Sequence, residues 1–210
     1  MTMRKYRFFR YFFICLSIHK SEKYDNIYRD LKGEYGMLKL FTPNYYIHSY
    51  DTLRPQFLVD HGISLLVCDI DNTLVPHDVA LPDEKVKQFL KGIQDAGIQI
   101  VFVSNNVEER VKTFAQDLAI PYYFFALKPL PFTYRKMLKD FHVKRQQVAV
   151  LGDQLMTDIL GANIMRFYTI LTAQAVERDL SFTKVNRVFE NMVFSLLKKT
   201  GKLVKGEFDE

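Results

Sequence analysis

From residue 63 onward, the hydrophobic and polar positions follow two patterns that alternate along the chain. Short continuous apolar runs predict buried strands at residues 63–69, 98–104, 122–126, 147–151 and 167–171. Apolar residues spaced three and four apart predict helices at residues 82–96, 107–118, 131–141 and 157–163. This alternation indicates a mainly parallel sheet covered by helices on both faces, an α/β fold of the Rossmann-like three-layer sandwich type.

Polar side chains stand where four of these strands end. Asp69 and Asp71 follow the first strand, Ser104 ends the second, Lys128 follows the third and Asp153 follows the fourth. Parallel α/β sheets bind ligands at the carboxyl ends of their strands, so these side chains should meet at one rim. Asp69 and Asp71 start from the same face of the strand and repel each other unless a cation or a shared proton relieves them. The pattern therefore predicts an enzyme that combines a divalent cation with phosphate chemistry.

The residues at these strand ends resemble the four motifs of the haloacid dehalogenase (HAD) superfamily of phosphohydrolases. The segment 69–73 has the form Asp-x-Asp-x-Thr of the first motif, and Ser104, Lys128 and the segment 152–158 follow in the order of the other three. The likeness covers roughly residues 60–172. Within the superfamily, the chain resembles the YqeG-like branch of subfamily IIIA, which is similar to phosphatidylglycerophosphatases. That closer likeness rests on the segments 40–43, 69–74, 104–106, 126–129, 152–158 and 182–187.

The resemblance implies a role for each motif residue. Asp69 is the expected nucleophile, which forms an aspartyl-phosphate, and Asp71 is the expected general acid and then general base. Asp69, the backbone carbonyl of Asp71 and Asp153 are the expected ligands of Mg²⁺. Ser104 and Lys128 are the expected catalytic groups that hold the other phosphate oxygens, with Lys128 offsetting their charge.

Three further residues are assigned to the same site. Thr73 is expected to order the loop after the nucleophile and, together with Asn105, to contact the substrate. Asp158 has two interpretations that the sequence leaves open. It is either an outer partner that supports the metal ligands, or a polar cap at the start of a helix.

The spacing of the motifs leaves no room for a large cap domain. Residues 74–103, between the first and second motifs, contain one expected helix and one strand, and residues 107–127 contain the same. A site without a cap admits a bulky phosphoester, on a macromolecule or at a membrane surface. The resemblance implies a lipid substrate, phosphatidylglycerophosphate, which the reaction would convert to phosphatidylglycerol.

The composition is compatible with this interpretation but does not select it. The chain has 210 residues, 48% hydrophobic and 25% charged, with a net charge of +5. The positive charge favours anionic partners such as phosphates or acidic lipid surfaces, and no nucleic acid partner is expected. Cys15 and Cys68 give no disulfide pattern, which favours the reducing cytoplasm. We therefore expect a cytoplasmic enzyme with peripheral contact at the inner face of an anionic membrane.

Three regions are expected along the chain. Residues 1–36 are an extension that is either non-native or close to a membrane, because residues 32–37 are compatible with a coded ribosome-binding site followed by a start at Met37. Residues 37–175 form the phosphatase domain. Residues 176–210 form a basic amphipathic helix and tail, whose apolar face either packs against the protein or lies on an anionic bilayer.

Two other functions use similar residues. A receiver-type signalling domain also places acids, a hydroxyl and a lysine on a parallel α/β sheet, and would hold its phosphoryl group without turnover. A non-catalytic binding protein can share the same fold. The position of the acid pair and Thr73 at the first strand favours the hydrolase. The sequence does not determine the oligomeric state.

Overall fold

The computed structural model describes residues 37–173, 193–201, 203–204 and 206–209. The chain divides into two compact units, Met1–Lys39 and Leu40–Glu210. The second unit contains every strand and helix described below except for the start of the short 3-10 helix η1 (Met37–Phe41). The predicted extension 1–36 lies outside the described residues.

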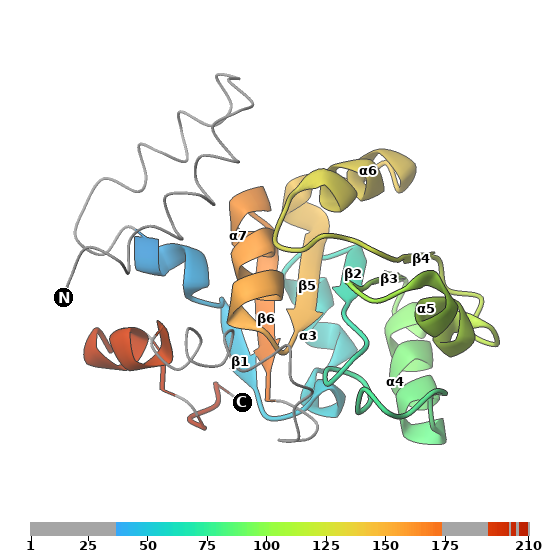
Figure 1. The fold of residues 1–210 in the computed structure, drawn as a ribbon, viewed down its shortest axis with the longest axis horizontal. Helices are drawn as coiled ribbons and strands as arrows, with labels where there is room; N and C mark the ends of the chain where they lie inside the picture. The colour runs from blue at the N-terminus through green and yellow to red at the C-terminus, as the bar shows by residue number, and fades with distance from the viewer. Residues whose placement is uncertain (1–36, 174–192, 202, 205, 210) are drawn as a thin grey trace. The chain divides into compact units, whose positions relative to one another are not determined.

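A six-stranded parallel sheet forms the centre of the second unit (Figure 1). Its strand order is β1-β6-β5-β2-β3-β4. β2 lies in the middle, with Val67 opposite Val101 of β3 on one side and Val150 of β5 on the other. The strands are β1 (Tyr45–Ile47), β2 (Leu65–Cys68), β3 (Gln99–Val103), β4 (Tyr122–Tyr123), β5 (Val148–Gly152) and β6 (Tyr168–Thr172).

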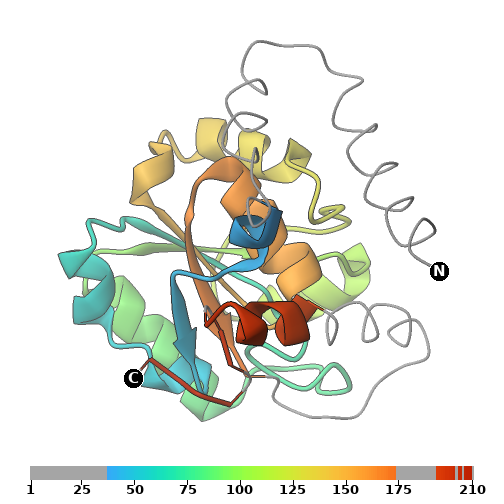
Figure 2. The same cartoon turned by 90° about the vertical axis from the view of Figure 1, so that its left-hand side faces the viewer.

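Helices cover both faces of this sheet, as Figure 2 shows. Leu58, Leu90 and Phe114 bring three helices into the hydrophobic core on one face, and Tyr134 and Ala162 bring two others into the core on the opposite face. The first group is α3 (Pro55–Asp60), α4 (Glu84–Asp95) and α5 (Glu108–Ala115); the second is α6 (Phe132–Asp140) and α7 (Leu160–Met165). Shorter helical turns are η2 (Tyr50–Thr52), η3 (Arg145–Gln147) and the π-helical η4 (Leu155–Ile159).

The three-layer fold and the alternation of strands and helices are confirmed. All five predicted strands and all four predicted helices are present, with boundaries that differ by a few residues. The sequence missed β1 and α3, which precede the first predicted strand. Two details were wrong. β4 is only two residues long, and the helix predicted at 157–163 is a π turn followed by α7.

The segments between the motifs contain no cap domain. In the described residues, α4 and β3 are the helix and strand between Thr73 and Ser104, and α5 and β4 are those between Asn106 and Lys128. Among the described residues, no helix combines the length and apolar character needed to cross a membrane.

The end of the chain returns to the edge of the sheet. Asp209 accepts a hydrogen bond from the Tyr46 backbone N–H at 2.7 Å, and its own N–H donates to the Tyr46 carbonyl at 2.8 Å. Before it, residues 193–199 are helical, with Val193 and Leu197 buried one turn apart. The described part of the predicted C-terminal helix therefore buries Val193 and Leu197, whereas Leu196 is 41% exposed. Residues 176–192 of that prediction lie outside the described residues.

Candidate active site

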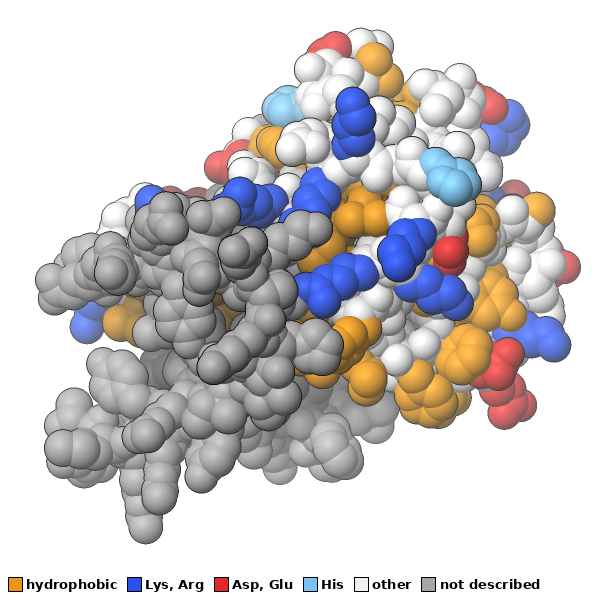
Figure 3. All heavy atoms as spheres, turned by 90° about the horizontal axis from the view of Figure 1, so that it is seen from above, with side chains coloured by type: hydrophobic (Ala, Val, Ile, Leu, Met, Phe, Trp, Pro, Cys, Tyr) orange, Lys and Arg blue, Asp and Glu red, His pale blue; other side chains and the backbone are white. Residues whose placement is uncertain are grey.

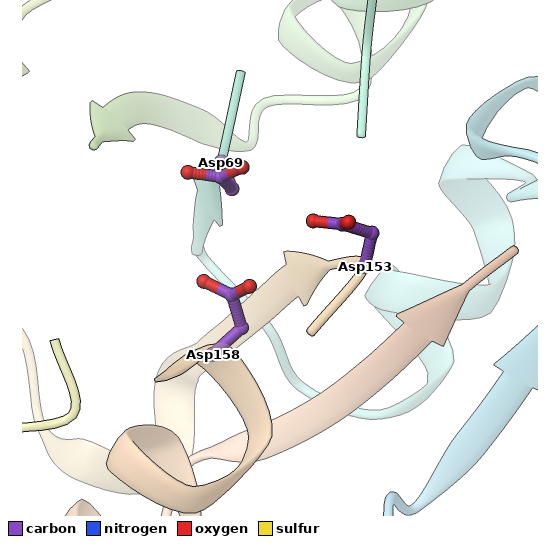
Figure 4. A group of neighbouring side chains, drawn as sticks. All are labelled: Asp69, Asp153 and Asp158. Carbon is purple, nitrogen blue, oxygen red and sulfur yellow. The ribbon is translucent and has the colours of Figure 1, made fainter. Parts of the chain in front are cut away.

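Three buried carboxylates converge at the carboxyl ends of neighbouring strands. Asp69 directly follows β2, Asp153 directly follows β5, and Asp158 lies in η4. Each offers an oxygen within 4.8 Å of the others, and the three side chains point toward one another in Figure 4. The sequence predicted that Asp69 and Asp153 would meet, and the pairing of β2 with β5 brings them together.

Lys128 binds two of the three acids. Its Nζ donates to Oδ1 of Asp69 at 2.7 Å and to Oδ1 of Asp158 at 2.6 Å. The exposed fraction of each of these three residues is 7% or less, so the charges interact with little screening by water. The sequence left open whether Asp158 supports the metal ligands or caps a helix. In the structure its carboxylate is part of the cluster and is therefore not only a helix cap.

The donor set fits a divalent cation. Three carboxylates and one ammonium group leave an excess of negative charge in a buried space. Isolated negative charge is costly to bury, and a cation with a preference for oxygen ligands relieves that cost. Asp69, Asp153 and Asp158 are the side chains that could hold it.

Gly152 makes room for Asp158. A Cβ on Gly152 would lie 2.7 Å from Oδ2 of Asp158 and closer still to its Cβ and Cγ. Any side chain at the end of β5 would therefore displace this carboxylate. The π-helical turn η4 fixes it from the other side, because the backbone N–H of Gln154 and the hydroxyl of Thr157 reach its Oδ2 at 3.2 and 3.3 Å.

The Thr73 hydroxyl lies between two acids of the cluster. It is 3.4 Å from Oδ2 of Asp69 and 3.2 Å from Oδ1 of Asp153, and it donates to them. This contact ties the loop after β2 to the end of β5. The contact is compatible with the predicted loop-ordering role, and both that role and the substrate contact predicted for Thr73 stay predictions.

Ser104 and Asn105 position the backbone around Lys128. The Asn105 amide binds that backbone twice, accepting from the Lys128 N–H at 2.7 Å and donating to the Lys128 carbonyl at 3.1 Å. The Ser104 hydroxyl is buried and accepts from the Asn106 N–H at 3.1 Å. Asn105 therefore holds the segment that carries the lysine, and the phosphate contacts predicted for both residues stay predictions.

The carboxylate of Asp71 has partners that the sequence did not predict. Arg110 of α5 donates to its Oδ1 through Nε at 3.1 Å and Nη2 at 2.8 Å, and Asn106 donates to Oδ2 at 3.1 Å. Arg110 also donates to the Ala80 carbonyl at 3.0 Å. An arginine on an amphipathic helix is usually solvent-exposed, so only the approach of α5 to the loop after β2 could reveal this role.

Burial changes the acid–base properties of the cluster. Burial raises the pKa of Asp69 to about 7, although nearby Lys128 opposes this shift. Burial also opposes the charged form of Lys128, yet Asp158 and Asp69 together raise its pKa. Without a metal, the lysine therefore keeps its charge, and Asp69 gains a proton more easily than an exposed carboxylate does.

Buried acids and a lysine at the carboxyl ends of a parallel sheet are the arrangement expected of a hydrolase of phosphoesters, and the acids could hold a metal ion. A family model of haloacid dehalogenase-like hydrolases matches residues 21–165, so the chain belongs to this family. It is 32% identical over 165 residues to the probable phosphatase YqeG of Bacillus subtilis (strain 168). The matched region covers 79% of this chain and 96% of the relative. The chain is a phosphatase of this family.

Solved structures of similar proteins share less sequence. An uncharacterized protein from Listeria monocytogenes serotype 4b is 16% identical, with a TM-score of 0.45, over 65% of this chain and 99% of that one. The cobalt-bound form of a deoxy-D-mannose-octulosonate 8-phosphate phosphatase from Haemophilus influenzae is 18% identical, with a TM-score of 0.43, over 68% and 91%.

Proposed function

We propose that the chain hydrolyses a phosphomonoester through an aspartyl-phosphate on Asp69, with Mg²⁺ as its cation. The observation that carries this proposal is the position of the Asp69 carboxylate, which contacts both Lys128 and Thr73 and lies within the acid cluster. Mg²⁺ held by Asp69, Asp153 and the Asp71 carbonyl, with Asp158 beside them, would neutralise charge on the phosphate.

The first step transfers the phosphoryl group to the enzyme. An Asp69 oxygen forms a bond to phosphorus while the bond from phosphorus to the alkoxide breaks. Asp71 gives its proton to that alkoxide, which leaves as an alcohol. Lys128 and Ser104 are the groups we assign to the remaining phosphate oxygens.

The second step restores the enzyme. Asp71, now a carboxylate, takes a proton from a water molecule as the water oxygen attacks phosphorus. The bond between Asp69 and phosphorus breaks, so Asp69 returns to a carboxylate and inorganic phosphate leaves. The contacts from Arg110 and Asn106 hold the Asp71 carboxylate, to which we assign both proton transfers.

We infer that the substrate is bulky and lipid-like, with phosphatidylglycerophosphate as the named candidate. The support is the lack of any cap domain between the motifs in the described part of the chain. Lids and caps exclude water around small substrates, and a large phosphoester can reach a site without one. A lipid substrate would bring the enzyme to a membrane surface, and we place it on the cytoplasmic side, at the inner face of the membrane.

Acid quenching during turnover tests the mechanism. With substrate labelled on its phosphate, the wild-type chain should retain label in a form that hydroxylamine releases, and Asp69→Asn should retain none. Turnover by Asp69→Asn would overturn the nucleophile assignment. A stable phosphoenzyme without release of phosphate would instead indicate a receiver-type domain, and neither label nor turnover on any ester would indicate a binding protein.

The substrate class needs a separate comparison. Phosphate release from phosphatidylglycerophosphate in mixed micelles should exceed release from nucleotides and sugar phosphates in kcat/KM. Equal or greater kcat/KM on the small esters would contradict the lipid assignment and leave the mechanism intact.

A further inference from the structure

Four large apolar side chains stand exposed around the segment that carries Lys128. We call them the apolar rim: Phe124, Phe125, Leu127 and Phe132, with exposed fractions of 38%, 56%, 59% and 54%. The rings of Phe124 and Phe125 contact each other, with centroids 6.0 Å apart. Exposed apolar residues scattered singly are ordinary, but a group of them beside an active site indicates a surface that another apolar body covers.

Hydrogen bonds fix the apolar rim to the active site. The Phe125 N–H donates to the Asn106 carbonyl and the Ala126 N–H to the Ser104 carbonyl, both at 3.0 Å. The Thr133 hydroxyl donates to the Ala126 carbonyl at 3.0 Å, which brings the start of α6 and Phe132 onto the same segment. The apolar rim therefore belongs to the ordered edge of the site, on the side of Lys128.

Two residues of the apolar rim adopt backbone angles that disfavour their side chains. Phe125 has a φ of 42° and Leu127 a φ of 56°, in the left-handed region that bulky residues rarely occupy. The residues that follow each of them, Ala126 and Lys128, are buried. The backbone is therefore strained at Phe125 and Leu127, whose side chains are exposed to solvent, while the Lys128 side chain that follows is buried. Strain of this kind persists at binding sites when the surrounding structure holds it.

The exposed charge beside the apolar rim is mainly basic. Arg135, Lys136 and Lys139 follow Phe132 on α6, and one acid, Asp140, ends the helix and accepts a hydrogen bond from the Tyr123 hydroxyl at 2.6 Å. On α6, Lys136 and Lys139 follow Phe132 by four and seven residues, so the three share one exposed face of the helix. Figure 3 views the molecule from the side of α6, where Lys and Arg side chains gather beside hydrophobic ones.

We propose that the apolar rim is a docking surface for an anionic phospholipid bilayer, and this inference rests on the proposed lipid substrate. Aromatic and aliphatic side chains enter the boundary between headgroups and acyl chains, and neighbouring lysines bind the anionic headgroups. The docked enzyme presents the Lys128 side of its active site to phosphomonoesters of lipids in the membrane.

Vesicle co-sedimentation of the full chain tests the docking surface. We expect binding to vesicles of phosphatidylglycerol and phosphatidylcholine, and much weaker binding to phosphatidylcholine alone. The test variant is Phe125→Asn/Leu127→Asn, because asparagine tolerates a left-handed φ and this change should preserve the fold. It should lower the partition coefficient on anionic vesicles by roughly tenfold or more, since two apolar side chains no longer enter the bilayer.

The matched control is Val59→Asn, at a residue of α3 that is 44% exposed. α3 leads into the amino-terminal end of β2, away from the strand ends that form the site, so this variant should bind like the wild type. Circular dichroism and the thermal midpoint establish that both variants fold. A destabilised double variant is replaced by Phe132→Ser, which changes the apolar rim at a helical backbone position.

Three results would overturn the inference. The first is a wild-type chain that does not bind anionic vesicles, and the second is an apolar-rim variant that binds them as tightly as wild type. The third is a wild-type chain that binds no vesicles but forms a concentration-dependent dimer, which the apolar-rim variant abolishes. Failure of the proposed function is separate. A chain that binds vesicles but hydrolyses no phosphomonoester refutes the function, whereas one that hydrolyses p-nitrophenyl phosphate but ignores vesicles refutes only the docking surface.

Discussion

Replacing Lys128 with methionine should destabilise the metal-free protein strongly. The ammonium group bridges Asp69 and Asp158, and the side chains of Lys128, Asp69 and Asp158 are 4%, 9% and 1% exposed. Methionine keeps most of the lysine stem but removes the charge, which leaves two buried carboxylates facing each other. Breaking a buried ion pair from one side costs about 3–5 kcal/mol. In a protein of this size that loss corresponds to a fall in the thermal midpoint of roughly 6–20 °C.

The measurement is urea unfolding in EDTA, repeated with Mg²⁺. We expect the free energy of unfolding to fall by about 3–5 kcal/mol in EDTA and by less with Mg²⁺, because the cation neutralises the same carboxylates. Adding Asp158→Asn to Lys128→Met should restore part of the loss, with a coupling energy of about 0.5–3 kcal/mol. Lys91→Met is the matched control, because this lysine is 73% exposed in its pair with Asp95 and should change stability by about 1 kcal/mol or less.

The same samples give a pH test with a definite sign. The pKa of Asp69 rises from 3.8 to about 7 in the folded, metal-free protein, chiefly because of burial. Between these values the folded chain holds a proton that the unfolded chain releases, so stability in EDTA should fall as pH rises from about 4 to 7. Lys128→Met should steepen that fall. The reasoning is refuted if Lys128→Met matches the wild type in EDTA within about 1 kcal/mol across this range.

Three other predictions follow from the site. Gly152→Ala should abolish Mg²⁺ binding in calorimetry by displacing Asp158, whereas Gly92→Ala, whose nearest contact would be 3.9 Å away, should keep it; equal effects would contradict this. Mg²⁺ at a hundred times its dissociation constant should stabilise the fold by about 2.7 kcal/mol in thermal melts, and an undiminished gain in Asp153→Asn would count against that ligand. Arg110→Lys should lower kcat roughly tenfold or more for alkyl phosphates and less for p-nitrophenyl phosphate, whose leaving group needs no proton; parallel losses would exclude a link to proton transfer.

The sequence predicted the sheet and the acid cluster because both depend on local patterns. Apolar runs identify strands that are buried on two faces, and the order of parallel strands brings Asp69 and Asp153 to one rim. β1 was missed because its three residues pair with β6 and with Asp209, which is 163 positions from Tyr46. Contacts of that range leave no periodic signal in the sequence.

The contact between Arg110 and Asp71 was missed for the same physical reason. It joins positions 39 apart, and nothing in the residue pattern of α5 distinguishes Arg110 from an arginine that faces water. The early end of β4 was missed for another reason. Phe124 and Phe125 fit a strand by residue type, but the chain leaves the sheet there through residues with positive φ. Residue preference therefore failed where the backbone turns to deliver Lys128 into the site.

The structure gives the two acids of the first motif separate cationic partners. Lys128, from the loop after β4, binds Asp69, and Arg110, from α5, binds Asp71. Without these partners, two carboxylates two positions apart would compete for the same cation or proton. Because the partners come from different elements, each acid is held by its own part of the fold. In the proposed mechanism, one carboxylate would attack phosphorus while the other would move protons, and separate partners suit that division of roles.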